Sequence, residues 1–207
     1  MDADAGKLLA GLCAGTGLSA ACGFRVFVPL LAISVAVRFF GVSVGPDFAW
    51  IGSWMALLVF ATATLVETFA YCIPWVDNAL DTVSTPLALA AGALAMIGML
   101  PDLHPAVKWT VGLLLGTGAA GVTQLSTVAL RATSSAATGG AGNCVVSTTE
   151  STSSLLLSIL SFVLPVVALA VGLWLAVGLV LIGKKIRMGR KIRSKTGMPR
   201  CLSFLSS

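Results

Sequence analysis

The sequence predicts an all-α fold, a polytopic bundle of transmembrane helices. Of its 207 residues, 57% are hydrophobic and only 10% are charged, which leaves too little polar surface to cover a water-soluble globule of this size. In lipid, only helices and closed barrels satisfy their own backbone hydrogen bonds. The apolar runs here are long and continuous, not alternating as in barrel strands, so the spanning elements are expected to be helices.

A group of cationic residues near the C-terminus predicts the orientation of the chain. Eight of the 13 Lys and Arg residues lie between Lys184 and Arg200, directly after an apolar run that ends at Gly183. Cationic segments stay on the cytoplasmic side and attract anionic lipid headgroups. We therefore expect residues 1–183 to form a single integral membrane domain and residues 184–207 to form a basic cytoplasmic tail.

These two regions predict a multi-pass protein of the inner, or plasma, membrane with its C-terminus in the cytoplasm. The expected partners are the lipid bilayer and, at the tail, anionic headgroups bound by Lys184, Lys185, Arg187, Arg190, Lys191 and Arg193. Without the tail the formal charge of +5 becomes −3, because residues 1–183 hold five basic and eight acidic residues. The pI of about 9.2 therefore gives no indication of a nucleic-acid partner.

The first apolar segments are shorter than the roughly 20 residues that a helix needs to cross a bilayer. Leu8–Cys22 is expected to form only a half-length helix, and Gly23 is expected to break it. A second segment, Arg25–Phe40, has Pro29 near its start, where proline is tolerated. Two short helices around a break indicate a re-entrant or interrupted span.

Two further apolar segments follow in the first half of the chain. Trp50–Cys72 is long enough to cross the bilayer and has Trp50, Trp54 and Tyr71 near its ends, where membrane proteins concentrate aromatic residues. The next apolar helix is expected over Pro86–Leu100.

Lys108–Arg131 is a second full-length span, and it carries glycines at three- and four-residue spacing. Small residues at this spacing let membrane helices approach closely. We expect this face to pack against another helix, and Gly112 and Gly116 also offer a contact for a homo-oligomer.

The last part of the membrane domain shows another interrupted segment. Residues 133–151 are rich in Ser, Thr and Gly and predict a flexible segment. The apolar run Ser153–Gly183 is about 31 residues long, and Pro165 divides it. Both ends of the domain thus have a short apolar piece, a break and a longer piece. This recurrence is typical of inverted-repeat transporters, whose sites lie at the breaks, although chance similarity in a Leu/Val/Ala-rich chain is the alternative.

Charged residues within apolar runs are the candidate functional residues. Each costs roughly 2.5–3.5 kcal/mol at the centre of a bilayer, so it needs a partner or a function. With two neighbouring polar residues, the candidates for substrate or ion binding are Arg25, Glu67, Tyr71, Asp77, Asn78, Asp81, Arg131 and Glu150. Glu67 is the most unusual of them, and Tyr71 lies one turn later on the same helix face.

Each candidate also has a structural interpretation. Glu67 is either a proton carrier or the partner of an arginine in an ion pair. Asp77 and Asp81 share one helix face and either bind a cation or substrate, or serve as helix cap and first-turn acid. Arg25 and Arg131 suit carboxylate or phosphate groups, or they extend toward the membrane surface.

Several classes of protein chemistry are not supported by the sequence. The single histidine, His104, and five scattered cysteines form no ligand set with metal-site spacing, so neither a metal nor another cofactor is expected. We find no P-loop and no Gly-x-Ser-x-Gly motif. An enzyme is therefore not expected, and a lipid-headgroup enzyme is only a third option because it lacks a nucleophile.

Several short motifs carry a family resemblance. They are Gly23-Phe24-Arg25-Val26-Phe27-Val28-Pro29-Leu30, Glu67, Ile73-Pro74-Trp75-Val76-Asp77-Asn78 with Asp81, Ala129-Leu130-Arg131, and Ser147-Thr148-Thr149-Glu150-Ser151. Together they resemble the DUF4126 family of bacterial integral membrane proteins over most of residues 10–170. The resemblance implies a membrane protein and no particular activity.

The leading hypothesis is a small inner-membrane transporter or channel-like permease. In this hypothesis broken helices bring the charged residues together near mid-membrane, where they handle an anionic or proton-coupled solute. The alternative is a membrane scaffold or assembly protein that does not transport. In that case the charges are structural ion pairs between helices.

Overall fold

The computed structural model describes most of residues 1–183. The described residues are 2–181 with gaps at 72, 102, 140, 141, 166, 168, 169, 172, 173, 175, 176, 179 and 180, and side chains are not described at 2–4, 74, 75, 77–79 and 81. The basic tail 184–207, including its expected lipid contacts from Lys184 to Arg193, lies outside the described residues.

The described part of the chain is helical and contains no strand, which confirms the predicted all-α fold. In chain order the elements are α1 (Asp2–Phe24), α2 (Phe27–Phe40), the 3-10 helix η1 (Pro46–Gly52), α3 (Trp54–Ala70), α4 (Pro74–Met99), α5 (Pro105–Val111), the π-helix η2 (Gly112–Gly116), α6 (Thr117–Thr138) and α7 (Asn143–Val163).

Several of these helices are suited to a membrane. Ala5–Phe24, Thr82–Met99 and Pro105–Thr138 are each long and apolar enough to cross one, and η1 with α3 makes a fourth candidate if this pair, bent by 67°, is a single span. Large apolar side chains also point outward, and Met55 and Phe69 are 73% and 72% exposed. An apolar surface of this kind is stable in lipid and not in water, so the chain is a membrane protein.

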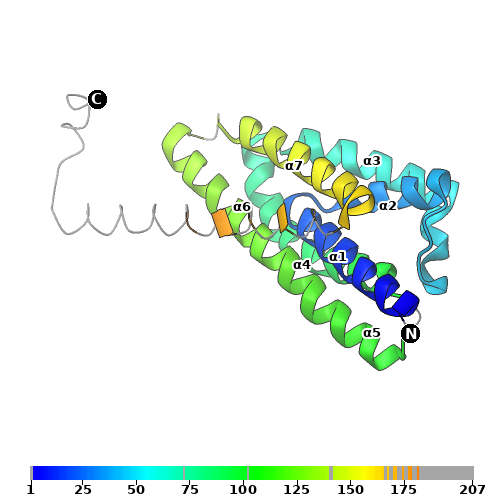
Figure 1. The fold of residues 1–207 in the computed structure, drawn as a ribbon. Coiled ribbons are helices and arrows are strands. Elements are labelled where there is room, and N and C mark those ends of the chain that lie inside the picture. The colour runs from blue at the N-terminus through cyan, green and yellow to red at the C-terminus, as the bar shows by residue number, and fades with distance from the viewer. Residues whose placement is uncertain are drawn as a thin grey trace.

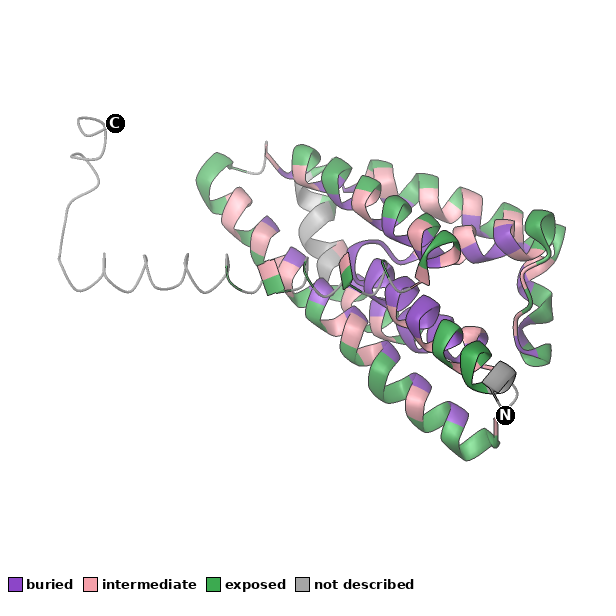
Figure 2. Cartoon of the chain, in the orientation of Figure 1, coloured by how far each residue is buried: buried purple, intermediate pink, exposed green. Residues whose placement is uncertain are grey.

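The helices form an up-and-down bundle around α1 (Figure 1). In this view α1, α3 and α6 run toward one end of the bundle, and α2, α4 and α7 run back from it. Helix α1 packs most extensively against α4, α6 and α7, whereas α2 packs against α3. Figure 2 shows the consequence, because buried positions concentrate on α1 while the outer helices are exposed on one side.

Helix α1 is longer than the sequence predicted. Instead of a short helix over Leu8–Cys22 that breaks at Gly23, a 23-residue helix continues through Gly23 to Phe24. A side chain at Gly23 would collide with Ala120 and Thr123 of α6, so this glycine allows close packing and does not end the helix. The break follows at Arg25 and Val26, and the short helix expected after it is confirmed as α2, with 14 residues.

Two other helices differ in detail from the prediction. The expected single span Trp50–Cys72 is bent at Ser53, where η1 ends and the Ser53 hydroxyl accepts a hydrogen bond from the Ala56 N–H (3.1 Å) to cap α3. Helix α4 begins at Pro74, with Pro86 inside it instead of at its start. Proline at the first position fits the helix start well, because the missing N–H is not needed there.

The second half of the chain also differs in detail. Lys108–Arg131 lies within one helical run over Pro105–Thr138, interrupted only by the π-helix η2. Where the sequence suggested a flexible segment over 133–151, α6 continues to Thr138 and α7 begins at Asn143. Helix α7 ends at Val163, in agreement with a break at Pro165.

The centre of the bundle is packed through small residues. A Cβ atom on Gly116 would lie 2.5 Å from the Gly92 carbonyl oxygen and 2.7 Å from the Ala93 Cα atom, so the backbones of η2 and α4 are in direct contact. Gly112 likewise lies against Ile97 of α4. The glycine face that offered a contact between two copies is thus used within one chain, as expected for close membrane-helix packing.

Candidate functional site

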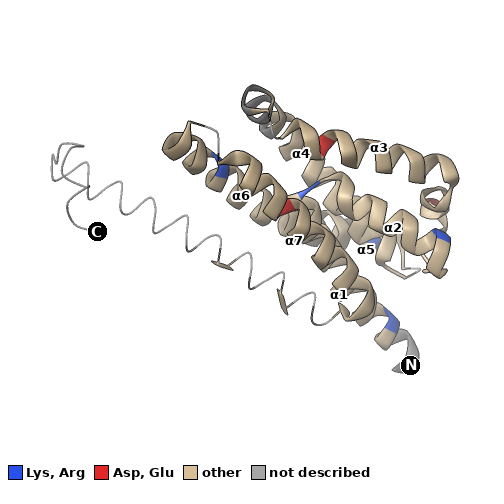
Figure 3. Ribbon diagram, turned by 90° about the horizontal axis from the view of Figure 1, so that it is seen from above, with Lys and Arg blue, Asp and Glu red and all other residues tan. Residues whose placement is uncertain are grey.

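Five of the candidate residues lie together in one buried cluster. They are Arg25, Glu67, Tyr71, Arg131 and Glu150, and each is at most 8% exposed. They come from the α1–α2 connection, from α3 and the residue that follows it, from α6 and from α7. We call this group the charge cluster. Figure 3 shows how few acidic and basic positions the helices carry elsewhere.

The charge cluster lies where two helices end and a third begins. Helix α1 ends at Phe24, one residue before Arg25, and α3 ends at Ala70, one residue before Tyr71. Helix α2 begins at Phe27, so the cluster lies at the break between α1 and α2.

Glu150 joins the two arginines of the charge cluster. The Arg131 Nε–H donates to Glu150 Oε1 at 3.1 Å, and Arg25 Nη2 lies 3.6 Å from Glu150 Oε2. Arg25 Nη2 also donates to the Ser147 carbonyl oxygen at 3.1 Å and contacts the Ser147 hydroxyl. Ser147 and Glu150 are one turn apart on α7, so this helix presents both groups to the arginines.

The ring of Tyr71 contacts both guanidinium groups. Its centroid lies 4.0 Å from Arg25 Cζ and 4.2 Å from Arg131 Cζ. Aromatic faces attract cations, most strongly where water is excluded. Tyr71 and Glu150 therefore hold two like charges in the same buried region.

Glu67 connects α3 to the start of α2. Its Oε1 and Oε2 atoms accept hydrogen bonds from the N–H groups of Val26 (3.0 Å) and Phe27 (3.2 Å). The first N–H groups of a helix have no partner within the helix, and the helix dipole favours a negative charge beside them. Glu67 thus caps the short helix that follows the break.

Three other candidate residues lie at the start of α4. Asp77, Asn78 and Asp81 belong to its first two turns, and their side chains are outside the described part of the structure. The N-cap of α4 is Ile73, so the interpretation of Asp77 as the helix cap is wrong. His104 precedes α5 at its N-cap position and makes no side-chain capping hydrogen bond.

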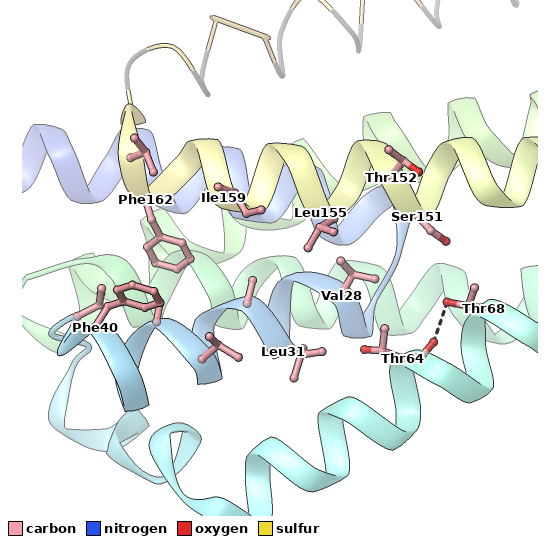
Figure 4. Close-up of a pocket in the computed structure, with 15 residues that line it drawn as sticks. Val28, Leu31, Phe40, Thr64, Thr68, Ser151, Thr152, Leu155, Ile159 and Phe162 are labelled. Carbon is pink, nitrogen blue, oxygen red and sulfur yellow. Dashed lines mark hydrogen bonds between the residues drawn. The ribbon is translucent and has the colours of Figure 1, made fainter.

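A groove of about 890 Å³ lies between α2, α3 and α7 (Figure 4). Most of its lining is apolar, and Phe40 and Phe162 lie at one end. Thr64, Thr68, Ser151 and Thr152 bring four hydroxyl groups to the other end. The groove is therefore amphipathic along its length.

The hydroxyl end of the groove adjoins the charge cluster. Thr64 and Thr68 lie on either side of Glu67 along α3, and Ser151 directly follows Glu150 on α7. The Ser151 hydroxyl donates to the Ser147 carbonyl oxygen at 3.0 Å, and the same oxygen accepts the hydrogen bond from Arg25. One carbonyl group thus separates the lining of the groove from a buried arginine.

Sequence reasoning missed the hydroxyl residues of both the charge cluster and the groove. Ser147 and Ser151 fall in a segment whose composition suggested flexibility, which hid their helical spacing. The signal was present, because the buried polar positions of α7 are three or four residues apart: Ser147, Glu150, Ser154, Ser158 and Ser161. This is the period of one helix face.

The described residues contain no group of three or more His, Cys, Asp or Glu side chains that could hold a metal ion. The charge cluster itself offers guanidinium, carboxylate and phenol groups.

Comparison with known proteins places the chain in a family. The model of the domain of unknown function DUF4126 matches residues 12–185. The chain belongs to the DUF4126 family. No curated protein and no solved structure matches it. The family match covers the charge cluster and the groove, and it agrees with the motifs from Gly23 to Ser151 that indicated this family.

Proposed function

We propose that this DUF4126 protein is a small transporter or channel-like permease of the bacterial inner membrane, with the basic tail in the cytoplasm. The charge cluster is its site for an anionic or proton-coupled solute. One observation carries the proposal. The Arg25 side chain is fully buried, yet its Nε and Nη1 atoms have no hydrogen-bond partner in the described structure. Buried donors are almost always satisfied, and an anionic group would satisfy these two.

The position of Arg25 supports this role. It lies in the break between α1 and α2, beside the first N–H groups of α2. In many transporters, breaks between helices form the solute site because helix starts and unwound backbone offer free polar groups. Glu67 occupies the first N–H groups of α2, and its protonation would release them. Glu67 is accordingly the proposed coupling residue.

Transport into liposomes tests this proposal. The purified chain is reconstituted into vesicles that contain a pH-sensitive dye, and proton uptake is followed on addition of small carboxylates and phosphates. We expect solute-dependent proton uptake that Glu67→Gln and Arg25→Gln both abolish. Arg38→Gln is the matched control, because Arg38 is exposed and stacks on Trp54 (4.6 Å) away from the cluster.

Folding must be separated from transport in these variants. Each variant is therefore compared with the parent protein by its elution profile and thermal stability in detergent. Folded Glu67→Gln and Arg25→Gln proteins with undiminished uptake would remove the assigned roles.

A membrane scaffold without transport is the second candidate function. Its support is the balance of charge within the cluster, where two arginines face two carboxylates and Glu150 pairs with both arginines. A charge-balanced set of this kind is sufficient for static ion pairs between helices, without a bound solute. Arg131→Glu combined with Glu150→Arg distinguishes the two candidates. Restored folding with full cellular function favours a scaffold, and restored folding without solute uptake favours a transporter.

A further inference from the structure

We propose that the groove between α2, α3 and α7 binds the alkyl chain of a fatty acid, with the carboxylate at the hydroxyl end beside Arg25. This inference rests on the proposed function and deepens it, because it names the solute as a single-chain anionic amphiphile. It is carried by the dimensions of the groove, by the uneven distribution of its polar groups and by an unsatisfied hydroxyl group.

The dimensions of the groove suit one alkyl chain. Its α2 wall runs from Val28 to Phe40 and its α7 wall from Ser151 to Val163. At a rise of about 1.5 Å per residue, each wall is about 18 Å long. This length is slightly more than one leaflet of a bilayer, which is about half of the roughly 30 Å hydrocarbon core and is the space that a single alkyl chain spans. The volume of about 890 Å³ also lies in the range of ligand pockets.

The groove is accessible from the lipid side. Leu155 and Ile159 on its α7 wall are 48% and 51% exposed, and Phe40 at its apolar end is 78% exposed. In a membrane these side chains face lipid, so an amphiphile can enter sideways without passing through water.

The polar groups of the groove are placed for a headgroup. All four hydroxyl residues of the lining lie at the end beside the charge cluster, and Figure 4 shows the two phenylalanines at the opposite end. The Thr64 hydroxyl is buried and has no hydrogen-bond partner in the described structure. A buried hydroxyl without a partner is unfavourable, and a carboxylate oxygen would accept its hydrogen bond.

Charge complementarity favours an anionic head. Arg25 keeps two nitrogen atoms without a hydrogen-bond partner, and it shares the Ser147 carbonyl oxygen with Ser151 of the groove. Hydrogen bonds from a guanidinium group to a carboxylate are stronger than those between neutral groups. A neutral amphiphile of the same length makes the same alkyl contacts but does not gain these charge-assisted hydrogen bonds.

Photolabelling of the full chain in lipid nanodiscs tests the groove. Three diazirine probes are used: palmitic acid, the matching fatty alcohol, and phosphatidylcholine with the label in one chain. We expect the fatty acid to label α2 and α7 at the groove, unlabelled palmitate to compete, and the alcohol to label about fivefold less.

Matched variants sharpen the test. Thr64→Val removes the unsatisfied hydroxyl and should weaken fatty-acid labelling about fivefold. Thr62→Val is the control, because the exposed Thr62 hydroxyl on the same helix donates only to its own helix, at Leu58 and Val59. Ala32→Trp fills the groove and should abolish labelling, whereas Leu114→Trp, at a lipid-facing position 70% exposed, should not.

Three outcomes would overturn the assignment of the groove. Equal labelling by acid and alcohol would exclude recognition of the head. Preferential labelling by phosphatidylcholine would indicate an ordinary lipid site. No labelling by any probe would mean that protein covers the groove.

The two experiments together separate failure of the groove assignment from failure of the proposed transport function. Groove labelling by the acid without any solute-dependent proton uptake would leave the groove assignment standing and remove transport. Uptake of small carboxylates without groove labelling would support transport and remove the groove assignment.

Discussion

Two regions of this bundle hold helices together with opposite kinds of side chain. Where η2 meets α4, Gly92 and Gly116 have no side chains, so the two backbones are in contact. At the charge cluster, large charged side chains fill the space between α3, α6 and α7. Lipid offers membrane helices little hydrophobic driving force for association, so close packing and polar contacts must supply it. The comparison shows two ways to hold membrane helices together, one by backbone contact and one by buried polar contacts.

Removing the central carboxylate should have the largest effect. Glu150→Ala leaves Arg25 and Arg131 without the carboxylate that they share. Breaking a buried ion pair by removing one partner costs about 3–5 kcal/mol. We expect this loss in the free energy of unfolding, measured by denaturation in mixed detergent micelles.

The double variant Arg131→Glu with Glu150→Arg is its control and should recover part of the loss. A loss below about 1 kcal/mol in Glu150→Ala would mean that the charge cluster contributes little to holding the helices together.

The glycine interface should tolerate very little added volume. Gly116→Ala places a methyl group 2.5 Å from the Gly92 carbonyl oxygen, and overpacking of this kind costs about 1–3 kcal/mol. Gly118→Ala is the matched control, because nothing lies within 4 Å of the added atom. Unfolding in the same micelles measures both. Equal stability of the two variants would show that α4 and η2 separate easily.

A single hydroxyl contact between helices should have the smallest effect. The Thr123 hydroxyl on α6 contacts the Ala20 carbonyl oxygen of α1 at 3.0 Å. Such contacts contribute about 0.6 kcal/mol on average in membranes, which is the loss expected for Thr123→Val. Ser126→Ala, whose hydroxyl donates within its own helix to Val122, should change stability less. A larger effect at Ser126 would contradict this ranking.

The fold class followed from composition, whereas helix boundaries did not. Long continuous apolar runs indicate helices in lipid, and the described part of the chain is built from helices, without a strand. The start of α4 was misplaced because Pro86 was taken as a helix start, although Pro74 carries the same signal twelve residues earlier. Gly23 was taken as a break because its partner, α6, is distant in sequence.

The charge cluster was easier to predict than the groove. Arg25, Glu67 and Glu150 were identifiable because a charge within an apolar run is costly, and the structure brings them together. Their exact partners were not identifiable: Glu67 binds backbone N–H groups, which no side-chain pattern reveals. Thr64 and Ser151 look like ordinary hydroxyl residues until three helices meet around them.

The separation of Arg25 from its acceptor on α7 has a consequence for biogenesis. The Ser147 carbonyl oxygen lies 122 residues later in the chain. A ribosome that adds about 5–20 residues per second needs about 6–24 seconds to make that stretch. Throughout this interval Arg25 lacks its acceptor on α7, and Tyr71 is a partner in the cluster that is made much earlier. The contact between the α1–α2 break and α7 therefore forms only after most of the bundle has been synthesised.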